Sequence, residues 1–384
     1  MSKFLEKKMR ELRKKTGSES YTNTKYATVN SWISSGDYGL NRLMSGSIYK
    51  GIPEGKIVQL AGESSTGKSI VAADIVINAI KDGYTKVFYV DSEGGMTREF
   101  IEQSGVDMNI IEIVPVESIE ECHVAMLNTF QFIREVQAEE PDSKFLFVID
   151  SLGALVPDKL IQDALKKDKM AGDMGLTAKL KNAMLKSWVM PTGKTHSSII
   201  IINHVYDDPA AMYTSKIKNI GGGKQTAFMP HITIQCSKVL EKKDDKDDEQ
   251  AFKGTIFKFF TVKNRCCKSF FEAELYLDYK KGFMKWFSLF QPALQMGFIK
   301  QAGAWYEVPT YSDKKLRKSE ILNNDAIWKT FLDDFEAKSL EMLSYSSPDV
   351  MDEESMDACI ENIVEMADED EDEVLTELIE PEDN

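Results

Sequence analysis

The sequence contains no run of about 18 consecutive apolar residues, the length with which a helix crosses a membrane. Its first residues, MSKFLEKKMRELRKK, lack the apolar stretch of a secretory signal peptide. The five cysteines are odd in number and lack the spacing of metal ligands, so they fit a reducing compartment better than a disulfide framework. These absences argue against a membrane-spanning or secreted protein, and we expect a cytoplasmic one.

The charge of the chain is unevenly distributed. The net charge is −15, but residues 349–384 hold 17 acidic and no basic residues, which leaves 45 acidic and 47 basic ones in residues 1–348. Residues 1–15 hold seven basic residues against two acidic ones. We expect an acidic disordered tail, which either shields a basic surface from nucleic acid or serves only solubility.

The spacing of apolar residues predicts an α/β fold. Short β-rich runs alternate with helical segments expected near 68–82, 97–104, 118–139 and 176–189; the runs are KIVQL, KVFYVD, IIEIVPV, KFLFVID and SSIIIIN. Continuous apolar strands between helices predict a parallel sheet covered on both faces. The later runs HITIQCSKVL, TIFKFFTVKN and FFEAELYLD follow one another without helices, which predicts an antiparallel extension of that sheet.

Four parts are predicted along the chain of 384 residues, which is long enough for two or three structural units. Residues 1–30 form a short basic amphipathic helix and a linker, and the helix must dock on its own core or on a neighbouring subunit to be stable. Residues 31–280 form the core, 281–345 a small mixed α/β C-terminal domain, and 346–384 the acidic tail. The apolar residues at helical spacing are Phe4, Leu5, Met9 and Leu12.

A phosphate-binding loop is predicted in AGESSTGKSIVAADI, residues 61–75. The stretch matches G-x-x-x-x-G-K-[ST] in full, between a strand and an amphipathic helix, and an ordinary Gly/Ser turn explains these flanks poorly. Backbone N–H groups at a helix N-terminus attract phosphate, the Lys68 ammonium can reach the β- and γ-phosphates, and the Ser69 hydroxyl can bind Mg²⁺. The residues predicted to hold the nucleotide are Gly62, Glu63, Ser64, Ser65, Thr66, Gly67, Lys68, Ser69 and Ile70.

Acidic residues end two of the predicted strands. Asp150 ends KFLFVID, where it can hold Mg²⁺ through a water shell; the alternative is that it caps the next segment. Asp91 and Glu93 follow KVFYV, and hydrolysis of a γ-phosphate needs one carboxylate that orients water. Alternation along the strand favours Glu93 for this task and makes Asp91 a local hydrogen-bond acceptor.

Two later stretches combine polar residues with weak patterning. Asn203 and His204 end SSIIIIN, where His204 either senses the γ-phosphate or is structural. Residues 205–230 contain GGGK and scattered aromatic and basic residues, which suits single-stranded nucleic acid, although a lid over a small substrate is the alternative. Lysines that either face phosphates or lie on a solvated helix follow Asp150: Lys159, Lys166, Lys167, Lys169, Lys179 and Lys181.

Together these motifs resemble those of the RecA-like homologous recombinases, most closely the bacteriophage UvsX branch. The resemblance covers roughly residues 36–306 and is carried by GESSTGKS, FYVDSE with GGMT, LFVIDSLGAL, GDMGLTAKL, IIINH, NIGGGK, FTVKNR and QAGAWYEV. The phosphate loop is shared by many unrelated NTPases. GDMGLTAKL and AGAWY in this order are much more discriminating.

The resemblance implies ATP and Mg²⁺ as cofactors and a role for each matching residue. Glu93 would act on the attacking water, Phe100 would stack on adenine, and Asp150 would hold the outer shell of the metal. Lys263 and Arg265 would reach into the ATP site of a neighbouring subunit, and His204 would sense the γ-phosphate. Two DNA-binding segments are implied, the first around residues 158–175 and the second around residues 206–230, with the residues Lys167, Lys169, Met170, Gly172, Gly221, Gly222, Gly223, Lys224 and Phe228.

The function implied by the resemblance is that of a DNA-dependent ATPase that forms a helical filament on single-stranded DNA. Such a filament pairs with homologous duplex DNA and exchanges strands in recombination, repair and recombination-dependent replication. Single-strand-binding and loading proteins are expected as accessory partners. The alternative is a ring-forming RecA-fold helicase that translocates along one strand. The short aromatic-Ala polymerisation motif of the family is not evident in ESYTNTKYATVN, so the docking contact of the N-terminal helix stays open.

Overall fold

The computed structural model of the chain describes residues 3–19, 28–94, 98–167, 174–206, 217–239, 254–279 and 282–345. The chain divides into a unit of residues 1–344 and a second unit of residues 345–384. The predicted acidic tail and most of the predicted N-terminal linker lie outside the described residues. Within the described part, no helix is long and apolar enough to cross a bilayer.

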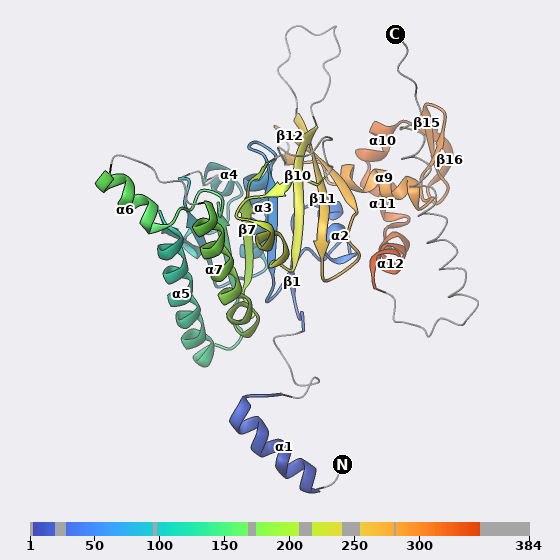
Figure 1. The fold of residues 1–384 in the computed structure, drawn as a ribbon. Helices are drawn as coiled ribbons and strands as arrows, with labels where there is room; N and C mark the ends of the chain where they lie inside the picture. Colours follow the sequence, from blue (N-terminus) through green and yellow to red (C-terminus); the bar gives the residue numbers. More distant parts are fainter. Residues whose placement is uncertain are drawn as a thin grey trace, which may run out of the picture. The chain divides into compact units, whose positions relative to one another are not determined.

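A nine-stranded sheet forms the centre of the first unit (Figure 1). Its strands β10, β3, β7, β6, β4 and β5 are mutually parallel neighbours, and β11, β12 and β13 continue it in antiparallel pairing. This confirms the predicted α/β fold with a mostly parallel sheet and an antiparallel extension. In order across the sheet the strands are β13 (Gly282–Phe283), β12 (Glu272–Asp278), β11 (Gly254–Asn264), β10 (Ile232–Val239), β3 (Ile57–Gly62), β7 (Ser198–Asn203), β6 (Phe145–Asp150), β4 (Lys86–Asp91) and β5 (Ile111–Pro115).

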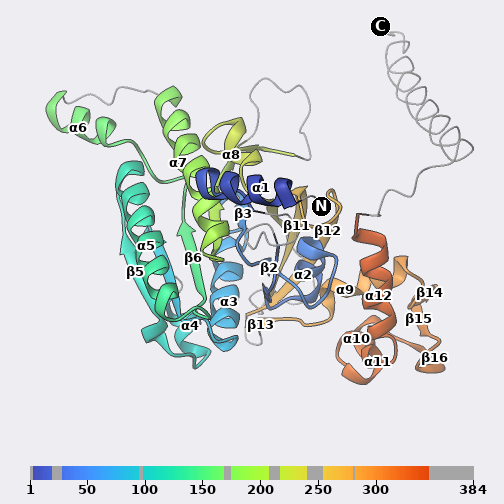
Figure 2. The ribbon, with the colours of Figure 1, turned by 90° about the horizontal axis from the view of Figure 1, so that it is seen from below.

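Helices cover both faces of this sheet, as Figure 2 shows. Successive side chains of a strand point to opposite faces, so the apolar run of β6 supplies both cores. Leu146 and Val148 join the core under α3 and α4, whereas Phe145, Phe147 and Ile149 join the core under α5 and α7. The helices of this region are α3 (Lys68–Lys81), α4 (Arg98–Gln103), α5 (Ile119–Glu139), α6 (Asp158–Lys167), α7 (Met174–Lys194) and α8 (Lys224–Phe228).

The C-terminal residues have a core of their own. The rings of Trp286 and Trp328 stack with centroids 5.0 Å apart, and Phe331 and Phe335 pack in the same cluster. A three-stranded antiparallel sheet and short helices surround this cluster, as expected for a small mixed segment. Its elements are α9 (Phe287–Gln295), β14 (Lys300–Ala302), β15 (Trp305–Val308), β16 (Ser312–Leu316), α10 (Lys318–Leu322), α11 (Asp325–Lys329) and α12 (Leu332–Leu343).

The N-terminal residues form α1 (Lys3–Thr16), the predicted short amphipathic helix, which has no buried residue. After it, β1 (Trp32–Ile33) pairs with β2 (Ile52–Pro53), and α2 (Tyr38–Ser45) lies between them in sequence. The side chain of Asp37 caps α2 by accepting a hydrogen bond from the Leu40 N–H. Helix α2 also meets α12, because the Arg42 Nε donates to the Ser339 hydroxyl at 2.9 Å.

Candidate active site

The predicted phosphate loop connects a central strand to a helix. Strand β3 ends at Gly62 and α3 begins at Lys68, so the loop lies at the carboxyl edge of the parallel sheet, where ligands bind in such folds. The surrounding atoms leave no room for a side chain at either glycine of the motif. A Cβ on Gly62 would lie 2.4 Å from the Cys236 carbonyl oxygen, and one on Gly67, which has a φ of 85°, would lie 3.0 Å from the Phe257 ring.

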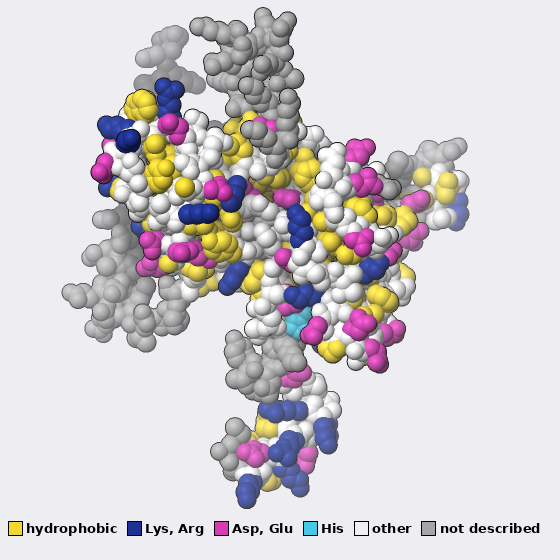
Figure 3. All heavy atoms as spheres, turned by 180° about the vertical axis from the view of Figure 1, so that it is seen from behind, with side chains coloured by type: hydrophobic (Ala, Val, Ile, Leu, Met, Phe, Trp, Pro, Cys, Tyr) yellow, Lys and Arg dark blue, Asp and Glu magenta, His cyan; other side chains and the backbone are white. Residues whose placement is uncertain are grey.

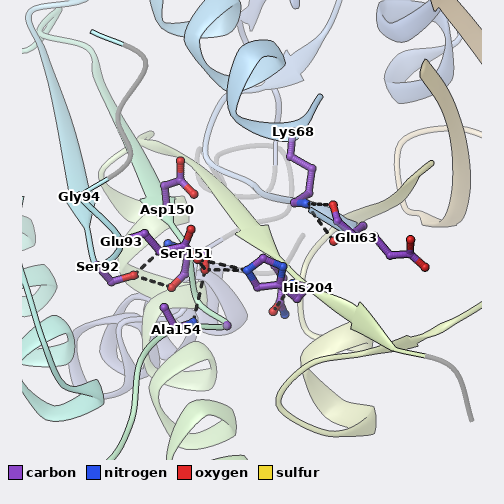
Figure 4. A network of polar contacts seen from close by, with 12 residues as sticks. Glu63, Lys68, Ser92, Glu93, Gly94, Asp150, Ser151, Ala154 and His204 are labelled. Carbon is purple, nitrogen blue, oxygen red and sulfur yellow. Dashed lines mark hydrogen bonds and ion pairs between the residues drawn. The ribbon is translucent and has the colours of Figure 1, made fainter. Parts of the chain in front are cut away.

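The Lys68 ammonium points back at its own loop (Figure 4). Its Nζ donates to the carbonyl oxygens of Gly62 at 2.9 Å and Glu63 at 2.5 Å, and burial lowers the pKa of the ammonium. The Glu63 carboxylate in turn forms an ion pair with Lys218 at 2.5 Å. The lysine that the motif assigns to phosphate is therefore already directed into the loop.

Ser69 and Asp150, the residues predicted to serve Mg²⁺, lie together at this edge. The Ser69 hydroxyl hydrogen-bonds to the Asp150 carboxylate, whose Oδ2 also accepts from the Tyr89 hydroxyl at 2.7 Å. Burial raises the pKa of Asp150. Among the described residues, no group of three His, Cys, Asp or Glu side chains could hold a metal ion. This hydroxyl and carboxylate fit a hard cation that takes its remaining ligands from phosphate and water, which is how Mg²⁺ is usually bound beside a nucleotide.

Glu93, Ser151 and His204 converge from three neighbouring strands (Figure 4). The Ser151 hydroxyl donates to Oε1 of Glu93, and the same oxygen lies 3.2 Å from His204 Nε2. Burial raises the pKa of Glu93, but the hydrogen bonds from Ser151 and His204 outweigh it and hold that pKa below its usual value. Asp91 does not join the cluster, because its Oδ1 accepts from the N–H groups of Glu93 and Gly94. This is the local acceptor role expected for it.

The second predicted DNA-binding segment is anchored beside His204. Its first residues, β8 (Val205–Tyr206), pair with β9 (Asn219–Ile220) in its middle. The Gly221 N–H donates to the His204 carbonyl at 2.9 Å, and the Asn203 amide donates to the Gly221 carbonyl at 3.0 Å. Gly222 and Gly223 have φ values of 91° and 90°, a conformation that glycine adopts without strain. A movement of Gly221 would therefore act directly on the backbone of His204.

Other residues predicted to bind DNA are placed only in part. Phe228 ends α8 with 62% of its surface exposed. Lys169, Met170 and Gly172 lie outside the described residues, as do the side chains of Lys167 and Lys224. Of the first predicted segment, around residues 158–175, the structure describes α6 and the start of α7, and residues 168–173 lie outside the described part.

Lys263 and Arg265 lie away from the phosphate loop of their own chain. Lys263 Nζ donates to the carbonyl oxygens of Phe228 and, at 2.7 Å, of Pro230. Burial, helped by the nearby Arg265, lowers the pKa of Lys263 to about 8. Arg265 lines a cavity of about 500 Å³ together with His231, and that cavity contains no residue of the phosphate loop. The structure thus does not bring these two cations into the site formed by their own chain.

Sequence reasoning missed several residues near the phosphate loop. A cavity of about 290 Å³ beside residues 65–70 is also lined by Lys238 and Tyr279, which the antiparallel pairing of β10, β11 and β12 brings back to the loop. Phe100, predicted to stack on adenine, packs half-buried against the core under α3 and does not line this cavity. Ser151 is a further such residue, and its adjacency to Asp150 in LFVIDS is the signal in the sequence that points to it.

Comparison with known proteins places these features in a family. Residues 3–284 match the RecA N-terminal domain. The chain is 29% identical to Protein RecA of Chloroherpeton thalassium over 266 residues, which cover 69% of this chain and 68% of that protein. It is 28% identical to Protein RecA of Chlorobium chlorochromatii over 279 residues, covering 72% and 74% of the two chains. With Protein RecA of Aquifex aeolicus it shares 26% identity over 266 residues, covering 69% and 71%.

Proposed function

The chain belongs to the RecA family, and from this membership we propose that it is an ATP-dependent recombinase that forms a helical filament on single-stranded DNA. The filament would pair with homologous duplex DNA and exchange strands. One observation carries the proposal: Glu93, which is predicted to act on water, contacts His204, and the carbonyl of His204 holds the first glycine of the second DNA-binding segment. Through this residue, nucleotide hydrolysis and DNA contact would be joined.

Hydrolysis of ATP would use the residues at the carboxyl edge of the sheet. Lys68 would bind the β- and γ-phosphates, and the Glu93 carboxylate would orient the attacking water and accept its proton. Ser69 would ligate Mg²⁺ directly and Asp150 through water; when bound, the ion supplies positive charge that offsets the charge of the phosphates. Phe100 is proposed from the resemblance to contact adenine. Tyr279, which lines the cavity beside the loop, is a further aromatic surface for the base.

His204 would report the γ-phosphate to the DNA-binding segment. Its ring contacts Glu93 and its backbone contacts Gly221, so a shift of the ring toward phosphate changes both contacts. Backbone amides and lysines of both segments would hold the sugar-phosphate chain, and exposed groups such as Phe228 would contact bases. Sequence would then be read by pairing between strands, because none of these contacts distinguishes one base from another.

Assembly of copies would complete the ATP site. The distance of Lys263 and Arg265 from their own phosphate loop supports action on the nucleotide of the next subunit, where they would stabilise charge on the γ-phosphate. Helix α1 has no buried residue and leaves Phe4 73% exposed, which supports docking on a neighbouring subunit. Figure 3 shows that basic side chains gather on this helix. ATP at the interface would make turnover depend on the filament.

Electron microscopy with single-stranded DNA and a non-hydrolysable ATP analogue tests the proposal. We expect an extended helical filament that coats the DNA stoichiometrically, and D-loop formation when ATP and homologous duplex are supplied. Lys68→Ala should abolish both, whereas Lys81→Ala, at the exposed end of the same helix, should leave both intact. Protein that stays monomeric with saturating ATP and DNA contradicts the proposal. Unwinding of a forked duplex by sub-stoichiometric protein would favour the helicase alternative.

We further propose that the chain lies in the bacteriophage UvsX branch of the family and acts in the cytoplasm of a host cell. By the resemblance, His204 would stand where bacterial relatives carry Gln, and the identity of 29% or less with the bacterial proteins named above fits a separate branch. Sequencing of the genomic neighbourhood tests this proposal. A bacterial housekeeping locus would contradict it.

A further inference from the structure

The hydroxyl of Ser151 is a buried group that the proposed chemistry does not yet use. The residue is fully buried at the end of β6, and its hydroxyl oxygen accepts a hydrogen bond from the Ala154 N–H at 3.3 Å. The same hydroxyl donates its proton to Oε1 of Glu93 (Figure 4). His204 Nε2 lies 3.5 Å from the same hydroxyl. Oε2 of Glu93 takes part in neither contact.

The turn that carries Ser151 is fixed to the neighbouring strand. The Ser92 hydroxyl donates to the Ser151 carbonyl at 2.8 Å and accepts from the Ser151 N–H at 2.9 Å, so it joins the ends of β4 and β6. Gly153 in the same turn has no room for a side chain, because a Cβ there would lie 2.6 Å from Cδ2 of His204. The hydroxyl of Ser151 is therefore held within narrow limits relative to Glu93.

Lys181 of α7 holds the other side of the turn. It belongs to the lysines expected either to face phosphates or to lie on a solvated helix, but it is only 3% exposed and its Nζ donates to the Gly153 carbonyl at 3.2 Å. Its aliphatic stem packs close to Gly222, where an added Cβ would lie 3.2 Å from Lys181 Cδ. Lys181 therefore contacts both the turn beside Glu93 and the second DNA-binding segment. It does so from α7, the helix in which the first DNA-binding segment ends.

Packing alone does not account for Lys181. Among the described residues its ammonium has no carboxylate partner, and burial lowers its pKa to about 8. A buried cation that is held by one carbonyl destabilises the fold relative to an apolar side chain of similar length. A lysine at such a position therefore points to a task other than stability.

We propose that Ser151 is a positioning residue that orients the Glu93 carboxylate, and that Lys181 couples the turn of residues 151–154 to the second DNA-binding segment. The inference rests on the proposed role of Glu93 in hydrolysis. A hydroxyl fixed on Oε1 selects one rotamer of the carboxylate and leaves Oε2 to accept the proton of water. DNA bound next to α7 and Gly222 would then act on Glu93 through the Gly153 carbonyl as well as through His204.

Steady-state hydrolysis of ATP with saturating single-stranded DNA tests the role of Ser151. For Ser151→Ala we expect kcat to fall about tenfold, as for the loss of one hydrogen bond to a charged group, with KM and filament formation on a non-hydrolysable analogue unchanged. Glu93→Gln serves as the reference variant. If Glu93→Gln is inactive but Ser151→Ala keeps the kcat of the wild type, the inference is wrong while the proposed function stands. If Glu93→Gln itself hydrolyses ATP normally, the proposed role of Glu93 is wrong.

The variant Lys181→Met tests the coupling separately from stability. We expect its midpoint of thermal unfolding to be equal to or above that of the wild type, while kcat with DNA falls several-fold and KM for ATP is unchanged. Lys186→Met, on the exposed side of the same helix, is the matched control and should keep full activity. Unchanged kcat in Lys181→Met would overturn the coupling. A fall in kcat accompanied by a lower unfolding midpoint would indicate a structural role and overturn it as well.

Discussion

Replacing Asp74 by Asn should stabilise the protein at neutral pH. Asp74 lies on α3, the helix that follows the phosphate loop, and its carboxylate packs against the backbone of Gly36, where an added Cβ would lie 1.9 Å from Asp74 Oδ2. Burial raises the pKa of Asp74 to about 6. Burial also raises the pKa of Asp37, a neighbouring carboxyl, to about 6, and the charge of Asp74 contributes to that shift. The charge of Asp74 thus adds to the effect of burial on Asp37.

The size and the sign of the effect follow from the pKa of Asp74. A rise from 3.8 to about 6 corresponds to about 3 kcal/mol between the protonated and the ionised form. Because the folded state binds the proton more tightly than the unfolded state, the stabilisation is complete below pH 3.8 and is lost as the pH rises through 6. At pH 7.5 the free energy of unfolding of the wild type should therefore be about 3 kcal/mol lower than that of Asp74→Asn. Below pH 4 the two proteins should be equally stable.

Urea unfolding of both proteins between pH 4 and pH 8, followed by tryptophan fluorescence and circular dichroism, measures this difference. Asp82→Asn, at the exposed C-terminal end of the same helix, is the matched control and should follow the wild type at every pH. Removing the charge of Asp74 also relieves Asp37, which adds to the effect in the same direction. A difference in the free energy of unfolding that is absent at pH 7.5, or that does not change between pH 4 and pH 7.5, would refute the reasoning.

Three further predictions concern assembly, the sensor and the tail. Lys263→Ala should lower ATP hydrolysis without weakening nucleotide binding by the monomer, and mixing it with Lys68→Ala should partly restore turnover; no restoration at any ratio contradicts action between subunits. Gly153→Ala should displace the His204 ring, because the new Cβ would lie 2.6 Å from Cδ2, and should reduce DNA-stimulated hydrolysis several-fold at normal nucleotide affinity. Equal turnover would show that the ring position is unimportant. Truncation after Ser347 removes 17 acidic residues and should tighten DNA binding at low salt, whereas an unchanged slope of log K against log salt favours a tail that serves only solubility.

The phosphate loop and the regular elements could be predicted from the sequence because each is specified by a contiguous stretch of chain. Gly62, Gly67 and Lys68 belong to one eight-residue motif whose backbone conformation and helix N-terminus are local properties. The largely apolar run KFLFVID predicts a buried strand for the same reason, since a strand covered on both faces needs apolar residues on both of them. The alternation of such strands with helices was enough to predict the mostly parallel sheet.

Only the tertiary structure decided which side chains meet at the site. The contacts of Glu93 with Ser151 and His204 arise because β4, β6 and β7 are neighbours, an order that the chain sequence does not state. Tyr279 reaches the phosphate loop through the pairing of three antiparallel strands, and Lys181 is buried although its sequence context is that of a solvated helix. A local pattern predicts the secondary structure of its own segment. Which of its faces is covered, and by which distant segment, depends on packing between parts of the chain that the pattern of any one part does not contain.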